Sequence, residues 1–214
     1  MPAPSNPVRV TDIYRGDNVT SFATAKANGL IGVIHKATTG RTGKDPMYKG
    51  RRTAAQAAGL LWGAYHWGTA VDVDKQIDNF LGWAEPDDRT LVALDYEKTS
   101  GNQMTLNQAR DFLHKLAQRL GRKPVLYCGG LLKGQLGHTQ DAFLGSHRLW
   151  LAHYSATPVP QASWNNYWLW QYTDGGPNDP APKTVPGIPG NSAGRLDCDH
   201  YDGTAARLAQ DWAS

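Results

Sequence analysis

The sequence contains little cysteine, little net charge and no long apolar run. Its two cysteines, Cys128 and Cys198, lie outside any C-x-x-C motif, so neither a redox site nor a cysteine-ligated metal is indicated. We expect free thiols, with a single disulfide as the open alternative. No stretch approaches the roughly 18 apolar residues that a membrane-spanning helix needs. The net charge of +3 without a long basic run does not indicate nucleic-acid binding.

Several catalytic and targeting motifs are also missing. The sequence has no H-E-x-x-H zinc motif, no G-x-S-x-G nucleophile elbow and no Gly-Lys phosphate loop. Residues 1–7 lack the basic lead and apolar core of a signal peptide, and we expect them to form a flexible arm. We therefore expect no cofactor and no metal, with Mg²⁺ or Ca²⁺ on clustered acids as the alternative.

Aromatic residues are abundant, with eight tryptophans and nine tyrosines. Such rings fill hydrophobic cores, and they also stack on the faces of sugars. Trp62, Trp83 and Trp212 are predicted to pack in the interior. Trp67 and Trp150 lie near predicted strand ends and are better candidates for a site.

Segments typical of strands and helices alternate along one domain of residues 1–214. The predicted strands cover 8–13, 30–36, 60–67, 91–97, 124–127, 148–153, 167–172 and 195–198. Helices are predicted at 21–28, 46–58 with Asp45 as N-cap, 72–84, 105–120 and 131–136. The alternation predicts a mostly parallel sheet in an α/β fold, namely an incomplete (β/α) TIM-like barrel with helices after the first four or five of eight strands. Residues 173–194, rich in proline and glycine, are predicted to be an irregular connection.

The strand at 91–97 ends in two acids, Asp95 and Glu97. Residues two positions apart on a strand face the same side, so both carboxyl groups point into one region. Mutual repulsion raises the pKa of one of them, and a protonated acid beside an ionised one is what glycosidic bond cleavage requires. The alternative is structural, with both acids capping the next loop or pairing with Arg or Lys.

Other polar residues end neighbouring strands, and functional groups of parallel barrels gather at that edge. The acids are Asp12, Asp95, Glu97, Asp197 and Asp199, and the aromatic residues are Tyr65, Trp67, Tyr127 and Trp150. An acidic centre with an aromatic rim suits a positively charged transition state on a sugar. His35 and His66 are predicted to be hydrogen-bonded strand-end residues rather than ligands.

These residues resemble glycoside hydrolase family 25, the lysozymes that cleave peptidoglycan, along about residues 10–203. The matching segments are T-D-I at 11–13, V-I-H-K-A-T at 33–38, G-A-Y-H-W at 63–67, L-D-Y-E at 94–97, W-L-A-x-Y at 150–154, W-Q-Y at 170–172, V-P-G-I at 185–188 and L-D-C-D at 196–199. Each motif is short, and their shared order along the chain carries the resemblance.

The resemblance implies hydrolysis of the β-1,4 bond between N-acetylmuramic acid and N-acetylglucosamine. Glu97 would be the general acid. Asp95 would be a nucleophile or would orient the substrate acetamido group. Asp12 and Asp197 would complete the acidic floor. Tyr65, Tyr127, Trp150, Trp67 and Asp199 would bind the glycan.

The sequence departs from the family at Thr39, where Glu is usual, at Arg15-Gly16-Asp17, where Gln often stands, and at Asp199, where Asn is common. Two other functions stay open, a catalytically silent glycan-binding barrel and a glycosidase acting on chitin or another amino-sugar polymer. Peptidoglycan is the expected partner of a monomer that binds no nucleic acid and no membrane. The expected route is cytoplasmic synthesis followed by release to the cell wall, through phage lysis as an endolysin or through specialised secretion of a bacterial effector.

Overall fold

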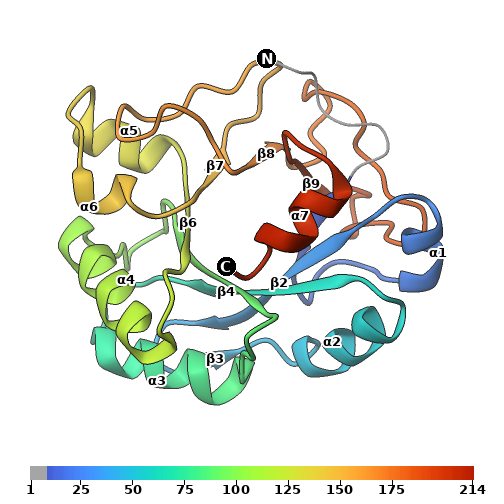
Figure 1. The fold of residues 1–214 in the computed structure, drawn as a ribbon, viewed down its shortest axis with the longest axis horizontal. Coiled ribbons are helices and arrows are strands. Elements are labelled where there is room, and N and C mark those ends of the chain that lie inside the picture. The colour runs from blue at the N-terminus through green and yellow to red at the C-terminus, as the bar shows by residue number, and fades with distance from the viewer. Residues whose placement is uncertain (1–8) are drawn as a thin grey trace.

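Within residues 9–214, nine strands form one sheet that closes on itself (Figure 1). The structure is a computed structural model that describes residues 9–214, and the arm predicted at residues 1–7 lies outside them. The strands are β1 (Val10–Ile13), β2 (Gly32–Thr39), β3 (Gly43–Lys44), β4 (Leu61–Trp67), β5 (Leu91–Tyr96), β6 (Val125–Cys128), β7 (Leu149–Ala152), β8 (Leu169–Thr173) and β9 (Asp197–His200).

The closure of the barrel depends on β1, which pairs with β2 in parallel and with β9 in antiparallel orientation. The pairings from β2 through β4, β5, β6 and β7 to β8 are all parallel, which confirms the predicted mostly parallel sheet. Strand β9 also runs antiparallel to β8. Because antiparallel neighbours need no crossover helix, the irregular connection between β8 and β9 suffices to join them. Strand β3 is a short hairpin partner of β2 outside the ring.

Five helices follow parallel strands, as predicted: α1 (Phe22–Ala27), α2 (Tyr48–Ala57), α3 (Val73–Ala84), α4 (Leu106–Leu120) and α5 (Gly130–Leu136). They lie around the outside of the ring of strands (Figure 1). The short helices α6 (Ala142–Gly145) and α7 (Ala205–Asp211) were not predicted. Among residues 9–214, no helix has the length and apolar character needed to cross a bilayer.

Helix α4 begins and ends where the sequence predicts. Thr105 and Gln108 form a reciprocal capping box, and Gly121 ends the helix at φ 68°, a left-handed conformation that glycine adopts readily. The prediction for α2 was wrong at its start, because Met47 rather than Asp45 is the N-cap. Both carboxylate oxygens of Asp45 are used elsewhere: Oδ1 accepts from the Met47 amide at 2.9 Å and Oδ2 from the Arg15 amide at 2.8 Å.

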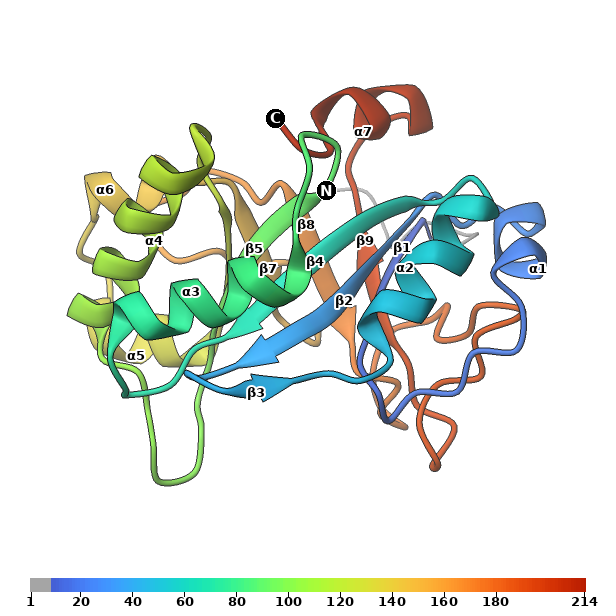
Figure 2. The ribbon, with the colours of Figure 1, turned by 90° about the horizontal axis from the view of Figure 1, so that it is seen from below.

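Helix α7 closes one end of the barrel. Because β9 runs opposite to the other strands, its C-terminal end leads the chain to the N-terminal ends of the parallel strands, where α7 lies. Figure 2 shows α7 at this end and the 97–105 connection projecting from the other. The Trp212 indole donates to the Trp62 carbonyl at 2.7 Å, and a Cβ on Gly32 would lie only 2.5 Å from the Trp212 ring. Trp62 and Trp212 are buried, as predicted, and Trp83 is half-buried.

Candidate active site

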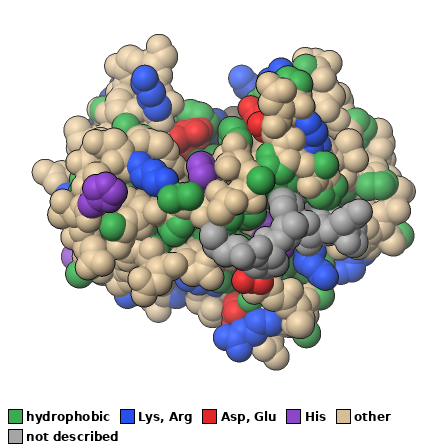
Figure 3. Space-filling model, turned by 90° about the horizontal axis from the view of Figure 1, so that it is seen from above, with side chains coloured by type: hydrophobic (Ala, Val, Ile, Leu, Met, Phe, Trp, Pro, Cys, Tyr) green, Lys and Arg blue, Asp and Glu red, His purple; other side chains and the backbone are tan. Residues whose placement is uncertain are grey.

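A cavity of about 490 Å³ opens at the carboxyl ends of the parallel strands. In the space-filling view it is a notch with acidic side chains at its floor and Lys or Arg on its walls (Figure 3). Eight of the nine predicted site residues line it: Asp12, Tyr65, Trp67, Asp95, Glu97, Tyr127, Trp150 and Asp197. The structure therefore brings these eight residues together in one cavity, and their assignment to the site and their individual roles stay predictions.

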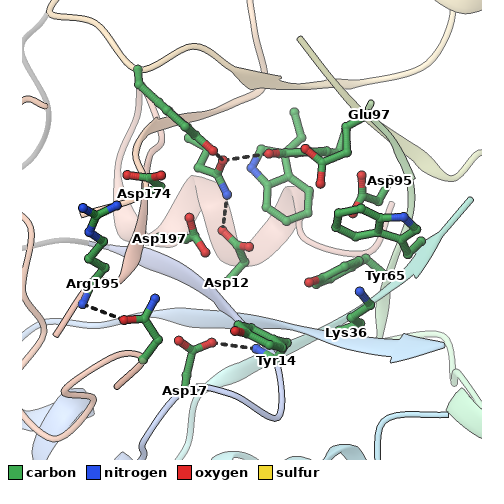
Figure 4. Close-up of a pocket in the computed structure, with 16 residues that line it drawn as sticks. Asp12, Tyr14, Asp17, Lys36, Tyr65, Asp95, Glu97, Asp174, Arg195 and Asp197 are labelled. Atoms are coloured by element: carbon green, nitrogen blue, oxygen red, sulfur yellow. Dashed lines mark hydrogen bonds between the residues drawn. The ribbon is translucent and has the colours of Figure 1, made fainter. Parts of the chain in front are cut away.

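Asp95 of β5 and Glu97, directly after that strand, share the cavity floor (Figure 4). Asp95 is 4% exposed, and its Oδ1 has no hydrogen-bond partner within residues 9–214. Burial raises the pKa of Asp95 well above its usual range, and the neighbouring Glu97 raises it further. Burial also raises the pKa of Glu97, against an opposing effect of Lys36. This pair therefore retains a proton at a pH where exposed carboxyl groups have lost theirs.

Lys36, within β2 just before a register shift in its pairing with β4, lines the cavity although it was not predicted as a site residue. Its ammonium lies 4.0 Å from the centroid of the Trp67 ring, a cation–π contact within the cavity. Burial lowers the pKa of Lys36, while Asp95 and Glu97 raise it. Lys36 therefore offsets part of the negative charge that accumulates when the acids of β5 ionise.

Gln171 of β8 joins Asp12 to two tyrosines. Its Nε2 donates to Asp12 Oδ2 at 2.7 Å, and its Oε1 accepts from the hydroxyl groups of Tyr127 at 2.7 Å and Tyr154 at 2.9 Å. Because Tyr127 and Tyr154 both donate to Oε1, the amide orientation is fixed and its N–H points at Asp12. Gln171 was not predicted as a site residue, although it lies within the W-Q-Y motif.

The prediction for Asp199 was wrong, because this residue is fully buried and does not line the cavity. Asp197 pairs with Asp12 and Asp199 with Val10, so Asp199 lies one layer deeper in the barrel. This follows from the reversed direction of β9, which enters the barrel from the cavity end. Asp199 Oδ1 accepts from the Trp150 indole at 2.6 Å. It therefore holds Trp150, whose ring packs edge-on against Tyr127 with centroids 4.7 Å apart.

Burial also raises the pKa of the acids at the start of β9 and in β1. For Asp12 the next largest cause is the carboxyl of Asp199, and for Asp197 it is the carboxyl of Asp12. The floor is thus a group of carboxyls too close together and too poorly hydrated to ionise together.

Both strand-end histidines are structural, as predicted. His35 Nδ1 donates to the Lys36 carbonyl at 2.7 Å, and its Nε2 faces Arg51 at 3.2 Å. His66 Nε2 lies 3.1 Å from Gln76 Oε1, and its Nδ1 lies 2.7 Å from the Thr38 hydroxyl. Burial lowers the pKa of both rings to about 4, so they are neutral at physiological pH. Both cysteines are buried free thiols, which excludes the disulfide.

Connections outside the strands supply the rest of the cavity wall: Tyr14 and Asp17 after β1, Tyr154 after β7, and Asp174, Asn191 and Arg195 between β8 and β9. The side chains between β8 and β9 were missed because an irregular segment has no periodicity from which to place them.

Replacing Asp95 with asparagine is expected to raise the melting temperature at pH 7. A carboxyl whose pKa is higher in the folded than in the unfolded protein destabilises the fold as the pH rises above the unfolded value of about 3.9. Asparagine cannot ionise, so the difference from wild type should vanish below pH 3.9 and grow toward neutrality. The test is thermal unfolding of wild type and Asp95→Asn between about pH 3.9 and pH 7. Asp88→Asn is the control, because Asp88 is exposed and its replacement should not produce this pH-dependent difference. A lower melting temperature for Asp95→Asn at pH 7 would contradict it.

Comparisons with known proteins agree with this geometry. The family model for glycosyl hydrolases family 25 matches residues 11–179. Lysozyme M1 of Streptomyces globisporus is 26% identical over 224 residues, covering 97% of this chain and 72% of that protein. A bacterial lysozyme from Streptomyces coelicolor has a TM-score of 0.81 at 25% identity, covering 96% of this chain and 97% of its own. A muramidase from Acremonium alcalophilum has a TM-score of 0.79 at 26% identity, covering 96% and 99%. The chain belongs to glycosyl hydrolase family 25 and is a glycoside hydrolase of the lysozyme type.

Proposed function

We propose that this peptidoglycan hydrolase cleaves the β-1,4 bond between N-acetylmuramic acid and N-acetylglucosamine, with Glu97 as general acid. The observation that carries the proposal is the pair of acids on β5, both with raised pKa, on the floor of an aromatic-walled cavity. The similarity to proteins named lysozyme and muramidase supports the same bond.

In the proposed reaction, the protonated Glu97 donates its proton to the glycosidic oxygen as that bond breaks. Positive charge then develops on the sugar ring, and ionised carboxylates among Asp95, Asp12 and Asp197 stabilise it. Lys36 opposes the rise in the pKa of both Asp95 and Glu97, which favours an ionised carboxylate beside the protonated acid. Tyr65, Tyr127, Trp67 and Trp150 would contact the glycan along the cavity walls.

Asp95 is proposed to act on the substrate acetamido group. Its Oδ1 is buried without a hydrogen-bond donor in the described part of the chain, so a substrate N–H would satisfy it. A carboxylate in this position would align the acetamido oxygen for attack on the sugar C1. Direct attack by Asp95 is the second route, and a covalent glycosyl–enzyme adduct detected by mass spectrometry would establish that route instead.

The bond that is cut can be identified from its products. Purified peptidoglycan is digested, the new reducing ends are reduced with borohydride, and the products are read by mass spectrometry. Reduced muramic acid ends are expected. Reduced glucosamine ends would place the cleaved bond on the other side of the sugar. If no new ends formed and the protein still bound the glycan, the silent glycan-binding alternative would replace this proposal, and cleavage of chitin alone would favour another amino-sugar polymer.

The substrate places the site of action at the bacterial cell wall. Action as a monomer is part of the proposal, because Asp12, Asp95, Glu97 and Asp197 meet in one cavity within a single chain, and light scattering of the purified protein tests it. Phage lysis and specialised secretion remain the two predicted routes of delivery.

A further inference from the structure

A second cavity adjoins the active-site cavity and has the opposite charge. This basic pocket has a volume of about 360 Å³, and its lining includes Tyr14, Arg15, Lys36, Thr39, Lys44 and Asp45. It shares Tyr14 and Lys36 with the active-site cavity, so the two are contiguous. The active-site cavity is lined by six carboxyl groups and two cations, and the basic pocket by three cations and one carboxylate.

The single carboxylate of the basic pocket does not neutralise its cations. Asp45 accepts backbone N–H groups from Met47 and Arg15 through its two oxygens, at 2.9 and 2.8 Å. Within residues 9–214, none of the seven ion pairs within 4.0 Å involves Arg15, Lys36 or Lys44. The charges of Arg15 and Lys44 are therefore available to a ligand, whereas Lys36 also faces Asp95 and Glu97 of the active-site cavity.

The backbone holds these cations at fixed places along the rim. Lys44 belongs to β3 and pairs with Thr38 of β2, and Arg15 is held through its amide by Asp45. Lys36 extends from β2 over the Trp67 ring. Arg15 and Lys44 are exposed, so their side chains can reach a ligand that leaves the active-site cavity.

The chemistry of peptidoglycan supplies a ligand that fits this pocket. The N-acetyl sugars at the cleaved bond are neutral, whereas the stem peptide attached to muramic acid carries free carboxylates. Carboxylates of the substrate are repelled by the acidic floor and attracted to the neighbouring cations. Arg15 can bind such a group with two parallel hydrogen bonds, and a lysine can bind it as a point charge.

We propose that the basic pocket binds the stem-peptide carboxylates of the muramic acid residue next to the cleaved bond. The inference rests on the proposed function and deepens it, since it makes the enzyme selective for glycan strands that carry acidic stems. The acidic cavity receives the sugars and the basic pocket receives the peptide.

The test compares three soluble glycan substrates free of other wall polymers: strands with native stems, strands with stem carboxyls converted to amides, and strands whose stems an amidase has removed. The measured quantity is kcat/KM from new reducing ends. Wild type is expected to prefer native over amidated stems about tenfold at low ionic strength, as one charge-assisted hydrogen bond allows. The preference should shrink as salt screens the exposed cations.

Two charge-reversal variants test whether residues of the basic pocket cause this preference. Arg15→Glu and Lys44→Glu should each abolish most of the preference for native over amidated stems. Lys26→Glu is the matched control, because Lys26 is exposed on α1, away from both cavities, and undergoes the same change of charge. It should keep the preference. Melting temperatures of all three variants verify folding, since Arg15 contributes to the fold through its backbone amide.

If wild type had equal kcat/KM on native and amidated stems, the basic pocket would not bind the stem carboxylates. This result would leave the identity of the cleaved bond unaffected. Loss of the preference in Lys26→Glu to the same extent as in Arg15→Glu would overturn the pocket assignment too, because the effect would then be one of net charge. The absence of new reducing ends from all three substrates would instead refute the proposed function, and the pocket assignment would fail with it.

Discussion

Glu97→Gln is expected to lower kcat by about 10²- to 10⁴-fold, the range that a general acid contributes. The amide keeps the size and hydrogen-bonding capacity of the side chain but has no acidic proton to give to the leaving oxygen. Burial raises the pKa of Glu97, so the wild-type side chain still holds that proton when exposed carboxyls have lost theirs. The measurement is turnover of peptidoglycan with the melting temperature recorded in parallel.

The sequence offers a matched control, because Glu85 is the other glutamate of the chain. It is exposed at the end of α3 and pairs with Lys49 at 3.1 Å, remote from the cavity. Glu85→Gln should therefore keep its turnover. If Glu97→Gln retained near wild-type kcat, the proton would come from another group, and Asp95 would be the first to consider.

Trp212→Ala is expected to lower the free energy of unfolding by about 3–5 kcal/mol, the range for truncating a large buried aromatic side chain. The indole is 1% exposed and donates a hydrogen bond to the Trp62 carbonyl at 2.7 Å. Truncation opens a cavity at the end of the barrel that α7 closes and removes the donor. Chemical denaturation gives the free energy of unfolding, and turnover well below the melting temperature gives the effect on catalysis.

Phe143→Ala is the comparison, because that aromatic side chain is 36% exposed on α6 and its truncation opens no interior cavity. Phe143→Ala should lower the free energy of unfolding much less than Trp212→Ala does. The Trp212 variant should retain most of its turnover in the folded state, because Trp212 lies at the far end from the cavity. A loss of kcat with unchanged unfolding free energy would show that Trp212 acts on the site instead.

The parts predicted correctly from the sequence depend on local patterns. Alternating strands and helices gave the barrel, and the D-x-E at the end of β5 gave the acids that the cavity contains. The bounds of α4 were predicted correctly because the residues that start and end it, Thr105 and Gly121, act within a few residues of their own positions. Asp12 could be placed beside that pair because the carboxyl ends of parallel strands meet at one edge, whereas Asp197 reaches this edge as the first residue of the antiparallel β9.

The parts that were missed depend on pairings between distant segments. The direction of β9 is set by its antiparallel pairing with β1 and β8, and no local pattern records it. For that reason Asp199 was assigned to the substrate although it supports Trp150. Lys36 was not predicted as a site residue because its place over the Trp67 ring depends on the register between β2 and β4, which shifts directly after Lys36.

The ring of strands closes through contacts that span almost the whole chain. The Thr11 hydroxyl donates to the Asp197 carbonyl at 2.5 Å, across 186 positions of sequence. Contacts of such separation form late, because a long loop must be ordered before they add stability. Asp12 and Asp197 therefore share one cavity only after β9 has been synthesised and has paired with β1. During translation Asp197 is the last of the floor acids to be made, so hydrolytic activity should arise in a single step, together with closure of the barrel.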